Sequence, residues 1–119
     1  VWGYLSGKNA SSQKCNYQIP ITKDWIQGTK EIDPALITQD WLTIKNTMWN
    51  YVGLIRTQER LHRAQDILRN LQYDIEKYYQ QYKLNPNIIG LRNGIQTAVA
   101  ITSSALEDRN SQGCHYIES

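Results

Sequence analysis

The segment Ser111-Gln112-Gly113-Cys114-His115-Tyr116 places a hydroxyl, an amide, a thiol, an imidazole and a phenol around one glycine. Such a set could bind a polar ligand, and Gly113 would permit the sharp turn that brings the side chains together. The same pattern is typical of a helix end followed by a docked tail. The residues alone favour neither reading over the other.

Other reactive side chains give weaker patterns. His62 has Asp66 one helical turn later, but both fall on the polar side of an expected helix, which favours a solvated surface pair over a metal site. Glu107 and Asp108 are adjacent, so they would point to different sides of a helix and not form a carboxylate pair. We therefore predict no catalytic and no metal-binding residue.

Glycine spacing bears on cofactor binding. The glycines stand at positions 3, 7, 28, 53, 90, 94 and 113, and none of them forms GxGxxG. That motif lets a backbone turn approach a pyrophosphate at a helix N-terminus. We expect this chain to bind no cofactor, FAD included, by itself.

Charge and aromatic content exclude other classes of partner. The net charge of +2 is spread along the chain without a basic cluster, which argues against nucleic acid and against a membrane surface. The run Tyr78-Tyr79-x-x-Tyr82 could stack on bases, but no basic groove accompanies it. A place in a helical core and its amphipathic rim is the favoured interpretation.

The 119 residues are enough for one domain with a core of its own. The apolar runs are too short for a membrane-spanning helix, and no signal peptide is visible, so we expect a cytoplasmic protein. Cys15 and Cys114 are far apart and lack a CxxC pattern, which favours free thiols over a disulfide. Because the sequence begins at Val1 and not at Met, we expect it to be processed or to belong to a longer polypeptide.

Hydrophobic periodicity predicts an all-α domain at 38–119, a three-helix up-down-up bundle after an irregular linker. The first helix should run from about Thr38, as N-cap with Asp40 in its first turn, to Tyr51, with Gly53 at the corner. The second should follow the cap Thr57. The third should begin at Asn85-Pro86 and end before Gly113.

The apolar stripes predict which residues form the core. Residues 1–37 should be the tail of a preceding domain, its helix stopped by Gly7 and Asn9, and then the linker. The core residues expected from the three helices are, in order, Trp41, Ile44, Met48, Val52 and Ile55; Leu61, Ala64, Leu68, Leu71, Ile75, Tyr78 and Tyr82; and Leu91, Ile95, Ala98, Thr102 and Ala105.

Three motifs, in this order and spacing, carry a family resemblance: MWNYVGLIRT at 48–57, LRN at 91–93 and Ser-x-Gly-x-His at 111–115. With them the chain resembles the C-terminal helical domain of the flavoproteins that include L-aspartate oxidase and the succinate dehydrogenase and fumarate reductase flavoprotein subunits. The first motif, and the lack of an acidic tail after His115, favour the L-aspartate oxidase branch. The family typically has Ser-Arg-Gly-x-His in the last motif, and here Gln112 replaces the Arg, so an ion pair made by that Arg is in doubt.

The resemblance implies a parent enzyme that oxidises L-aspartate to iminoaspartate with FAD in de novo NAD biosynthesis, with quinolinate synthase as the next enzyme. It implies that catalytic and FAD-binding residues lie upstream of this chain. It also implies that Ser111, Gln112, Gly113, His115 and Tyr116 dock on the FAD-binding catalytic domain of the same polypeptide. A succinate dehydrogenase or fumarate reductase subunit, and a free-standing helical adaptor that binds a partner helix, stay open as alternatives.

Overall fold

The fold is seen in a computed structural model that describes residues 2–13 and 28–118. Its elements, in chain order, are α1 (Trp2–Ser12), α2 (Pro34–Tyr51), β1 (Ile55–Arg56), α3 (Gln58–Gln81), α4 (Pro86–Glu107) and β2 (Tyr116–Ile117). The prediction of a mostly helical chain is confirmed. The short parallel sheet of β1 and β2 was not predicted.

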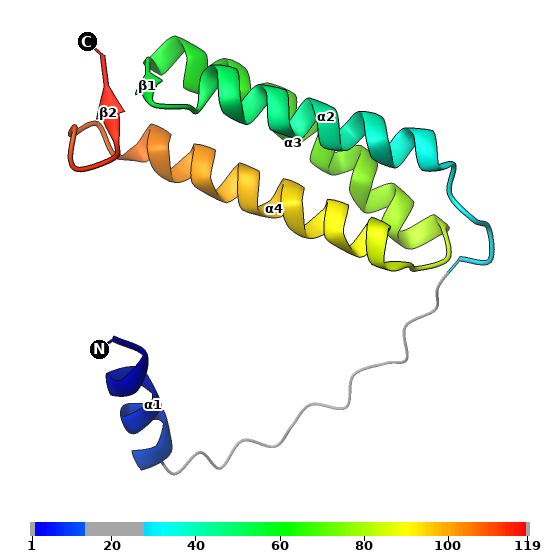
Figure 1. The fold of residues 1–119 in the computed structure, drawn as a ribbon, viewed down its shortest axis with the longest axis horizontal. Coiled ribbons are helices and arrows are strands. Elements are labelled where there is room, and N and C mark those ends of the chain that lie inside the picture. Colours follow the sequence, from blue (N-terminus) through cyan, green and yellow to red (C-terminus); the bar gives the residue numbers. More distant parts are fainter. Residues whose placement is uncertain (1, 14–27, 119) are drawn as a thin grey trace.

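Helices α2, α3 and α4 pack against one another and run alternately in opposite directions (Figure 1). Their inward faces enclose one apolar core, to which Ile32 and Val52 add side chains from just outside the helices. The buried apolar residues are Ile32, Ile37, Ile44, Val52, Leu61, Ala64, Leu68, Ile75, Ile88, Leu91, Ile95, Ala98 and Ala105.

The starts of α3 and α4 agree with the sequence. The Thr57 side chain accepts a hydrogen bond from the Arg60 amide, and the Asn85 side chain accepts from the amides of Asn87 and Ile88. Each cap satisfies backbone donors that have no partner within the helix, with Pro86 at the position where a missing N–H costs nothing.

The predicted start of α2 at Thr38 is wrong. Asp33 is the N-cap, its side chain accepts from the Ala35 amide at 2.9 Å, and Pro34 is the first helical residue. Thr38 instead lies inside the helix, where its hydroxyl donates to the Pro34 carbonyl. Asp40 is therefore well past the first turn. The Asp-Pro pair is the stronger start signal, because it joins a capping carboxylate to a residue with helical φ.

The N-terminal segment also differs from expectation. Helix α1 continues through Gly7 and Asn9 to Ser12, so the prediction that these two residues stop it is wrong. None of its residues is buried, and it stands apart from the other helices (Figure 1). Most of the predicted linker, 14–27, lies outside the described residues. Before α2, the carbonyl of Lys30 accepts from the amide of Lys83 at 2.8 Å, which ties this run to the loop after α3.

The predicted core faces are largely confirmed. All five stripe residues of α4 are buried, as are Leu61, Ala64, Leu68 and Ile75 on α3. Leu71, Tyr78, Tyr79 and Tyr82 pack partly buried against the core, in line with the expected rim. Ile55 is 54% exposed, so its assignment to the core is wrong: the chain has already left α2 and entered β1.

One close helix contact was not visible in the sequence. The Trp41 ring of α2 lies against the backbone of α4 at Gly94, where an added Cβ would collide with the ring. Gly90, one turn earlier in α4, has open space at the equivalent point. Thus Gly94 lets the outer edge of the Trp41 indole approach the backbone of α4.

Candidate functional site

The C-terminal turn, residues 111–116, is closed by its own backbone. The Gln112 amide donates to the His115 carbonyl at 2.8 Å, and the His115 amide donates back to the Gln112 carbonyl at 3.0 Å. Gly113 has φ of +58°, a conformation that a side chain disfavours, so the glycine is required by the geometry of the turn.

Ser111 holds the chain that leaves this turn. Its hydroxyl accepts from the Ile117 amide at 3.0 Å and lies 3.2 Å from the Ile117 carbonyl, to which it donates. Strand β2 then pairs in parallel with β1, with Ile55 opposite Tyr116 and Arg56 opposite Ile117. Ser111 therefore sets the register of β2 and is occupied within the chain.

Arg56 joins the C-terminal turn to the corner after α2. Its Nε donates to the carbonyls of Val52 and Gly53, both at 3.1 Å, where a positive charge complements the helix C-terminus. Its Nη1 lies 2.7 Å from Nδ1 of His115, and its own carbonyl accepts from the Glu118 amide at 2.8 Å. The Arg56 side chain thus joins the corner after α2 to the C-terminal turn, and the Arg56 backbone holds the end of β2. We call the side-chain pair with His115 the Arg56–His115 latch.

The partners of His115 determine its tautomer. A guanidinium can only donate, so Nδ1 must be the acceptor in the latch. The proton then sits on Nε2, which donates to the Asp108 carbonyl at 2.8 Å, at the end of α4. The neutral imidazole therefore bridges Arg56 to the last turn of α4, and a doubly protonated ring would place a donor against a donor.

The latch unites two of the motifs singled out in the sequence. Gly53-Leu54-Ile55-Arg56-Thr57 and Ser-x-Gly-x-His are distant in the chain, yet Arg56 and His115 meet. Sequence reasoning missed Arg56 as a site residue. Its position within a family motif could have marked Arg56 as important, but nothing in the sequence indicates that it contacts His115.

Of the five predicted docking residues, Ser111 and His115 are engaged within the chain, and Gly113 shapes the turn. Gln112 and Tyr116 are exposed, Tyr116 by 51%. Leu54, 85% exposed, stands beside β1 on the same edge of the structure. The C-terminal turn therefore presents an amide and a phenol ring to its surroundings, and the neighbouring corner before β1 adds the aliphatic side chain of Leu54.

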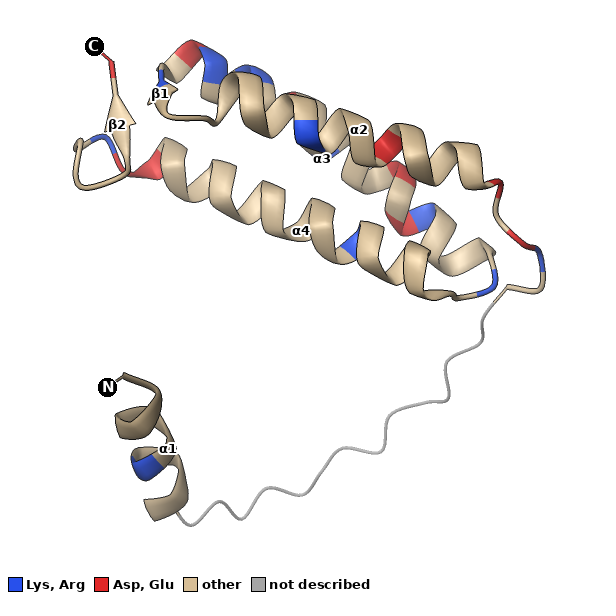
Figure 2. Cartoon of the chain, viewed as in Figure 1, with Lys and Arg blue, Asp and Glu red and all other residues tan. Residues whose placement is uncertain are grey.

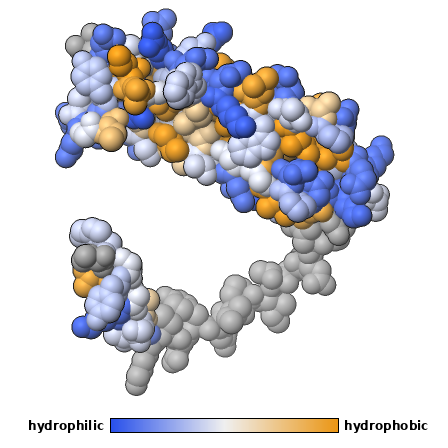
Figure 3. All heavy atoms as spheres, viewed as in Figure 1, coloured by the Kyte–Doolittle hydropathy of each residue, from blue (hydrophilic) through white to orange (hydrophobic). Residues whose placement is uncertain are grey.

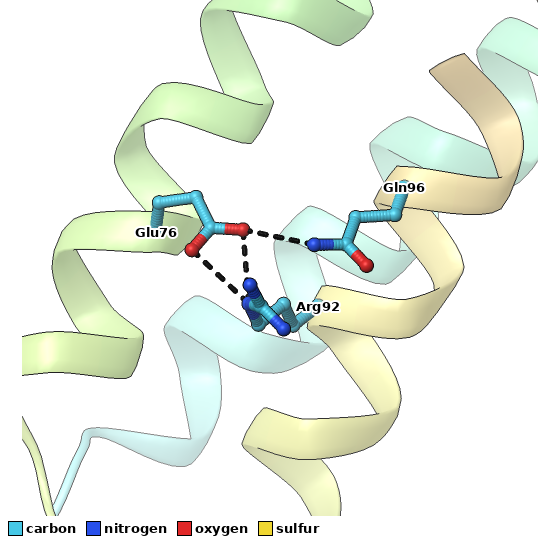
Figure 4. A network of polar contacts seen from close by, with 3 residues as sticks. All are labelled: Glu76, Arg92 and Gln96. Carbon is cyan, nitrogen blue, oxygen red and sulfur yellow. Dashed lines mark hydrogen bonds and ion pairs between the residues drawn. The ribbon is translucent and has the colours of Figure 1, made fainter. Parts of the chain in front are cut away.

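The remaining motif, LRN at 91–93, supplies the contact shown in Figure 4. Arg92 of α4 donates through Nε to both carboxylate oxygens of Glu76 on α3, at 2.9 and 3.0 Å, and Gln96 donates to the same carboxylate at 3.2 Å. The guanidinium also lies over the Tyr79 ring, 4.4 Å from its centroid. This half-buried network fixes α3 against α4.

Two perturbed groups lie at the interface of α2 and α3. Burial, and then the charge of Asp74, raise the pKa of the Asp40 carboxyl, whose Oδ2 atom has no hydrogen-bond partner. Burial also raises the pKa of the Tyr78 phenol, with Asp40 and Asp74 adding to the effect. Both groups lie on α2 and α3. The latch is elsewhere, between the corner after α2 and the end of α4.

The remaining sequence candidates do not converge. His62 and Asp66 are both exposed on α3, and Glu107 and Asp108 are exposed at the end of α4. Cys114 is a free, exposed thiol, whereas Cys15 lies outside the described part of the chain. Within residues 2–13 and 28–118, no group of three or more His, Cys, Asp or Glu side chains could hold a metal ion. No helix in these ranges is long and apolar enough to cross a membrane.

Residues 41–119 match the protein family described as the fumarate reductase flavoprotein C-term. The chain belongs to this family. The matched range includes all three motifs, the whole of α3 and α4, and α2 from Trp41 onward. The latch and the Arg92 network therefore both lie within the matched range.

Individual relatives point to one branch. The chain is 36% identical to an L-aspartate oxidase of Acinetobacter baylyi over 103 residues, which cover 85% of this chain and 19% of that protein. It is 39% identical to an L-aspartate oxidase of Pseudomonas aeruginosa over 93 residues, 78% of this chain and 17% of that protein. A Yersinia pestis L-aspartate oxidase is 38% identical over 82 residues, 69% of this chain and 15% of that protein. The chain thus spans about a fifth or less of the length of these relatives.

Proposed function

We propose that the chain is the C-terminal structural domain of an FAD-dependent L-aspartate oxidase, which converts L-aspartate to iminoaspartate in de novo NAD biosynthesis. The observation that supports this most is the family match over 41–119 together with the three L-aspartate oxidases that are 36–39% identical to this chain. The domain takes no part in the chemistry itself.

The domain is a three-helix up-down-up bundle. The sequence predicted it over residues 38–119, and α2 moves its start to Pro34. The tail of the preceding domain and the linker, predicted as 1–37, therefore end at Asp33. The described residues contain no glycine-rich turn before a helix, and the helix starts at Thr57 and Asn85 are occupied by capping side chains. These residues do not fit a flavin pyrophosphate, so FAD belongs to the preceding part of the polypeptide.

The C-terminal turn is the docking element of the domain. The FAD-binding catalytic domain of the same polypeptide is its partner, and Gln112 and Tyr116 carry the contact, because their side chains are exposed. Ser111, Gly113 and His115 give the turn its shape. In the family an Arg stands where this chain has Gln112, so the contact here is a neutral hydrogen bond and not an ion pair.

The wider setting follows from the proposed enzyme. It acts in the cytoplasm, and quinolinate synthase consumes its product. A succinate dehydrogenase or fumarate reductase flavoprotein subunit is the second candidate, since the description of the matched family names the fumarate reductase flavoprotein.

The deciding experiment uses the protein encoded by the complete reading frame. Purified with its flavin, it should reduce FAD when L-aspartate is added and should leave it oxidised with succinate. Reduction by succinate but not L-aspartate would favour the second candidate. A reading frame that starts near Val1, with no upstream domain, would favour a free-standing adaptor.

The docking role is tested by Tyr116→Ser, with Tyr73→Ser as the matched control. Both phenols are exposed, by 51% and 65%, but Tyr73 lies on the charged side of α3. In the full-length protein, Tyr116→Ser should lower the thermal midpoint more than Tyr73→Ser does. In the 119-residue chain Tyr116→Ser should lower the midpoint no more than Tyr73→Ser does, since the Tyr73 ring lies 4.1 Å from Lys77 Nζ. Equal effects in the full-length protein would contradict docking through the C-terminal turn.

A further inference from the structure

Helix α4 has an exposed face without charge. Its exposed residues between Ile88 and Leu106 are Ile89, Asn93, Thr97, Ala100, Ile101 and Ser104, which we call the α4 outer face. They recur every three or four residues and so form one stripe along the helix. Figure 2 shows α4 uncoloured by charge except at Arg92 and near Glu107.

The exposed face of α3, in contrast, is charged. Its exposed residues include Glu59, Arg60, Arg63, Asp66, Arg69, Asp74 and Lys77. A helix face that meets water normally carries such charges, because they are well hydrated and keep apolar surface from associating. The two faces belong to one small bundle, so general composition does not explain the difference.

The α4 outer face leads into the C-terminal turn. Ala100, Ile101 and Ser104 line an open hollow together with Ala105 and, at the side of the C-terminal turn, Arg56, Asp108 and His115. Ile101 is 44% exposed and Ile89 41%, so apolar side chains reach the surface at both ends of the stripe. Figure 3 shows orange, apolar residues between pale and blue, hydrophilic ones on the side of the bundle where α2 and α4 lie. The uncharged surface is therefore continuous with the proposed docking element.

We infer that the α4 outer face is buried, in the full-length protein, against the catalytic portion that precedes this chain, while the charged face of α3 stays in water. The inference rests on the proposed function. The relatives place most of their length outside this chain, which covers 19% and 17% of two of them, and the matched family is a C-terminal one. In the proposed full-length protein, a large catalytic portion therefore precedes this chain and contacts one side of the bundle.

The residues also define the kind of surface that fits. Ala100 and Ser104 are small, so the backbone of a partner helix can approach closely. Asn93, Thr97 and Ser104 offer neutral hydrogen-bonding groups. A buried charge on the partner would meet no opposite charge along the stripe itself, since Arg56 and Asp108 lie only at its C-terminal end. The partner surface is therefore an uncharged helix face from the catalytic portion.

Single cysteines test this in the full-length, flavin-loaded protein. Ala100→Cys and Ser104→Cys place a thiol on the α4 outer face with little change in volume, and Asn70→Cys places one on the exposed side of α3. The rate at which maleimide labels each thiol is measured by mass spectrometry of the peptide that contains it, once in the native protein and once in urea. Labelling at 100 and 104 should be at least about tenfold slower than at 70 in the native protein, because a covered thiol reacts only when the contact opens. In urea the three rates should converge.

Equal native rates at 100, 104 and 70 would overturn the inference. Slow labelling that becomes fast on dilution, as a dimer dissociates in sedimentation, would also overturn it and assign the face to a second copy. Flavin reduction by L-aspartate is measured on the same samples. Fast labelling in an active oxidase refutes the face alone, whereas slow labelling in a protein inactive towards L-aspartate refutes the proposed function alone.

Discussion

Replacing Gly94 and Gly90 by alanine, one at a time, should change stability in opposite directions. The two glycines lie one turn apart in α4, so both substitutions gain the same intrinsic preference of alanine over glycine, about 1 kcal/mol in a helix interior. At Gly90 the new methyl group meets no atom within 4 Å, and that gain should appear in full.

At Gly94 the methyl group would collide with the Trp41 ring. The ring is held between α2 and the core, so accommodating the methyl means moving the indole or spreading the helices, at a cost of about 1–3 kcal/mol. After the helix gain is subtracted, Gly94→Ala should be neutral to about 2 kcal/mol destabilising. The difference between the two variants, about 1–3 kcal/mol, isolates the collision.

Urea unfolding of the 119-residue chain, followed by tryptophan fluorescence and by circular dichroism, measures both variants against the parent sequence. The double variant Gly94→Ala with Trp41→Leu is the control, since a smaller side chain should relieve most of the penalty. If Gly94→Ala proved as stable as Gly90→Ala, the close packing of Trp41 on α4 would be wrong.

Three further predictions concern the core, the latch and the α2–α3 interface. Leu68→Ala, at a fully buried site, should cost about 2–5 kcal/mol in urea unfolding, whereas Arg69→Ala on the exposed side should cost less than about 1 kcal/mol; similar losses would refute the face assigned to α3. Arg56→Gln should cost about 1–3 kcal/mol, because it leaves backbone carbonyls and His115 without a charged donor, and hydrogen exchange at the Glu118 amide should quicken; unchanged exchange would contradict the latch. Asp40→Asn should raise stability near neutral pH. Burial and Asp74 raise the pKa of this carboxyl, so the free energy of unfolding of the native chain falls as the pH rises through that pKa. The variant should lack this loss, which is measured by comparing urea midpoints at acidic and neutral pH.

Local sequence determined much of the helical framework. Thr57 and Asn85-Pro86 start α3 and α4 as predicted, since capping depends only on a side chain and the backbone two or three residues away. The apolar spacing of Leu91, Ile95 and Ala98 likewise identified the buried face of α4, because a period near 3.6 leaves one side for the core. The motifs, read in order, also pointed to the family that residues 41–119 match.

Two helix ends were predicted wrongly although the sequence contains the signal for each. Asp33-Pro34 starts α2 before the weaker cap Thr38, and Gly7 is carried inside α1 because a glycine lowers helix stability without forbidding the helix. These errors concern boundaries, where neighbouring residues compete by small free energies.

The tertiary structure alone decided which distant residues meet. The Arg56–His115 latch, the parallel pairing of β1 with β2 and the contact of Trp41 with Gly94 each join segments far apart in the chain. No periodicity or spacing encodes such pairs, since they depend on how three helices settle against one another once their apolar faces are buried. The sequence by itself determined the helices, their inward faces and the family, while the packing of those helices decided what the C-terminal turn is attached to and which surface is left without charge.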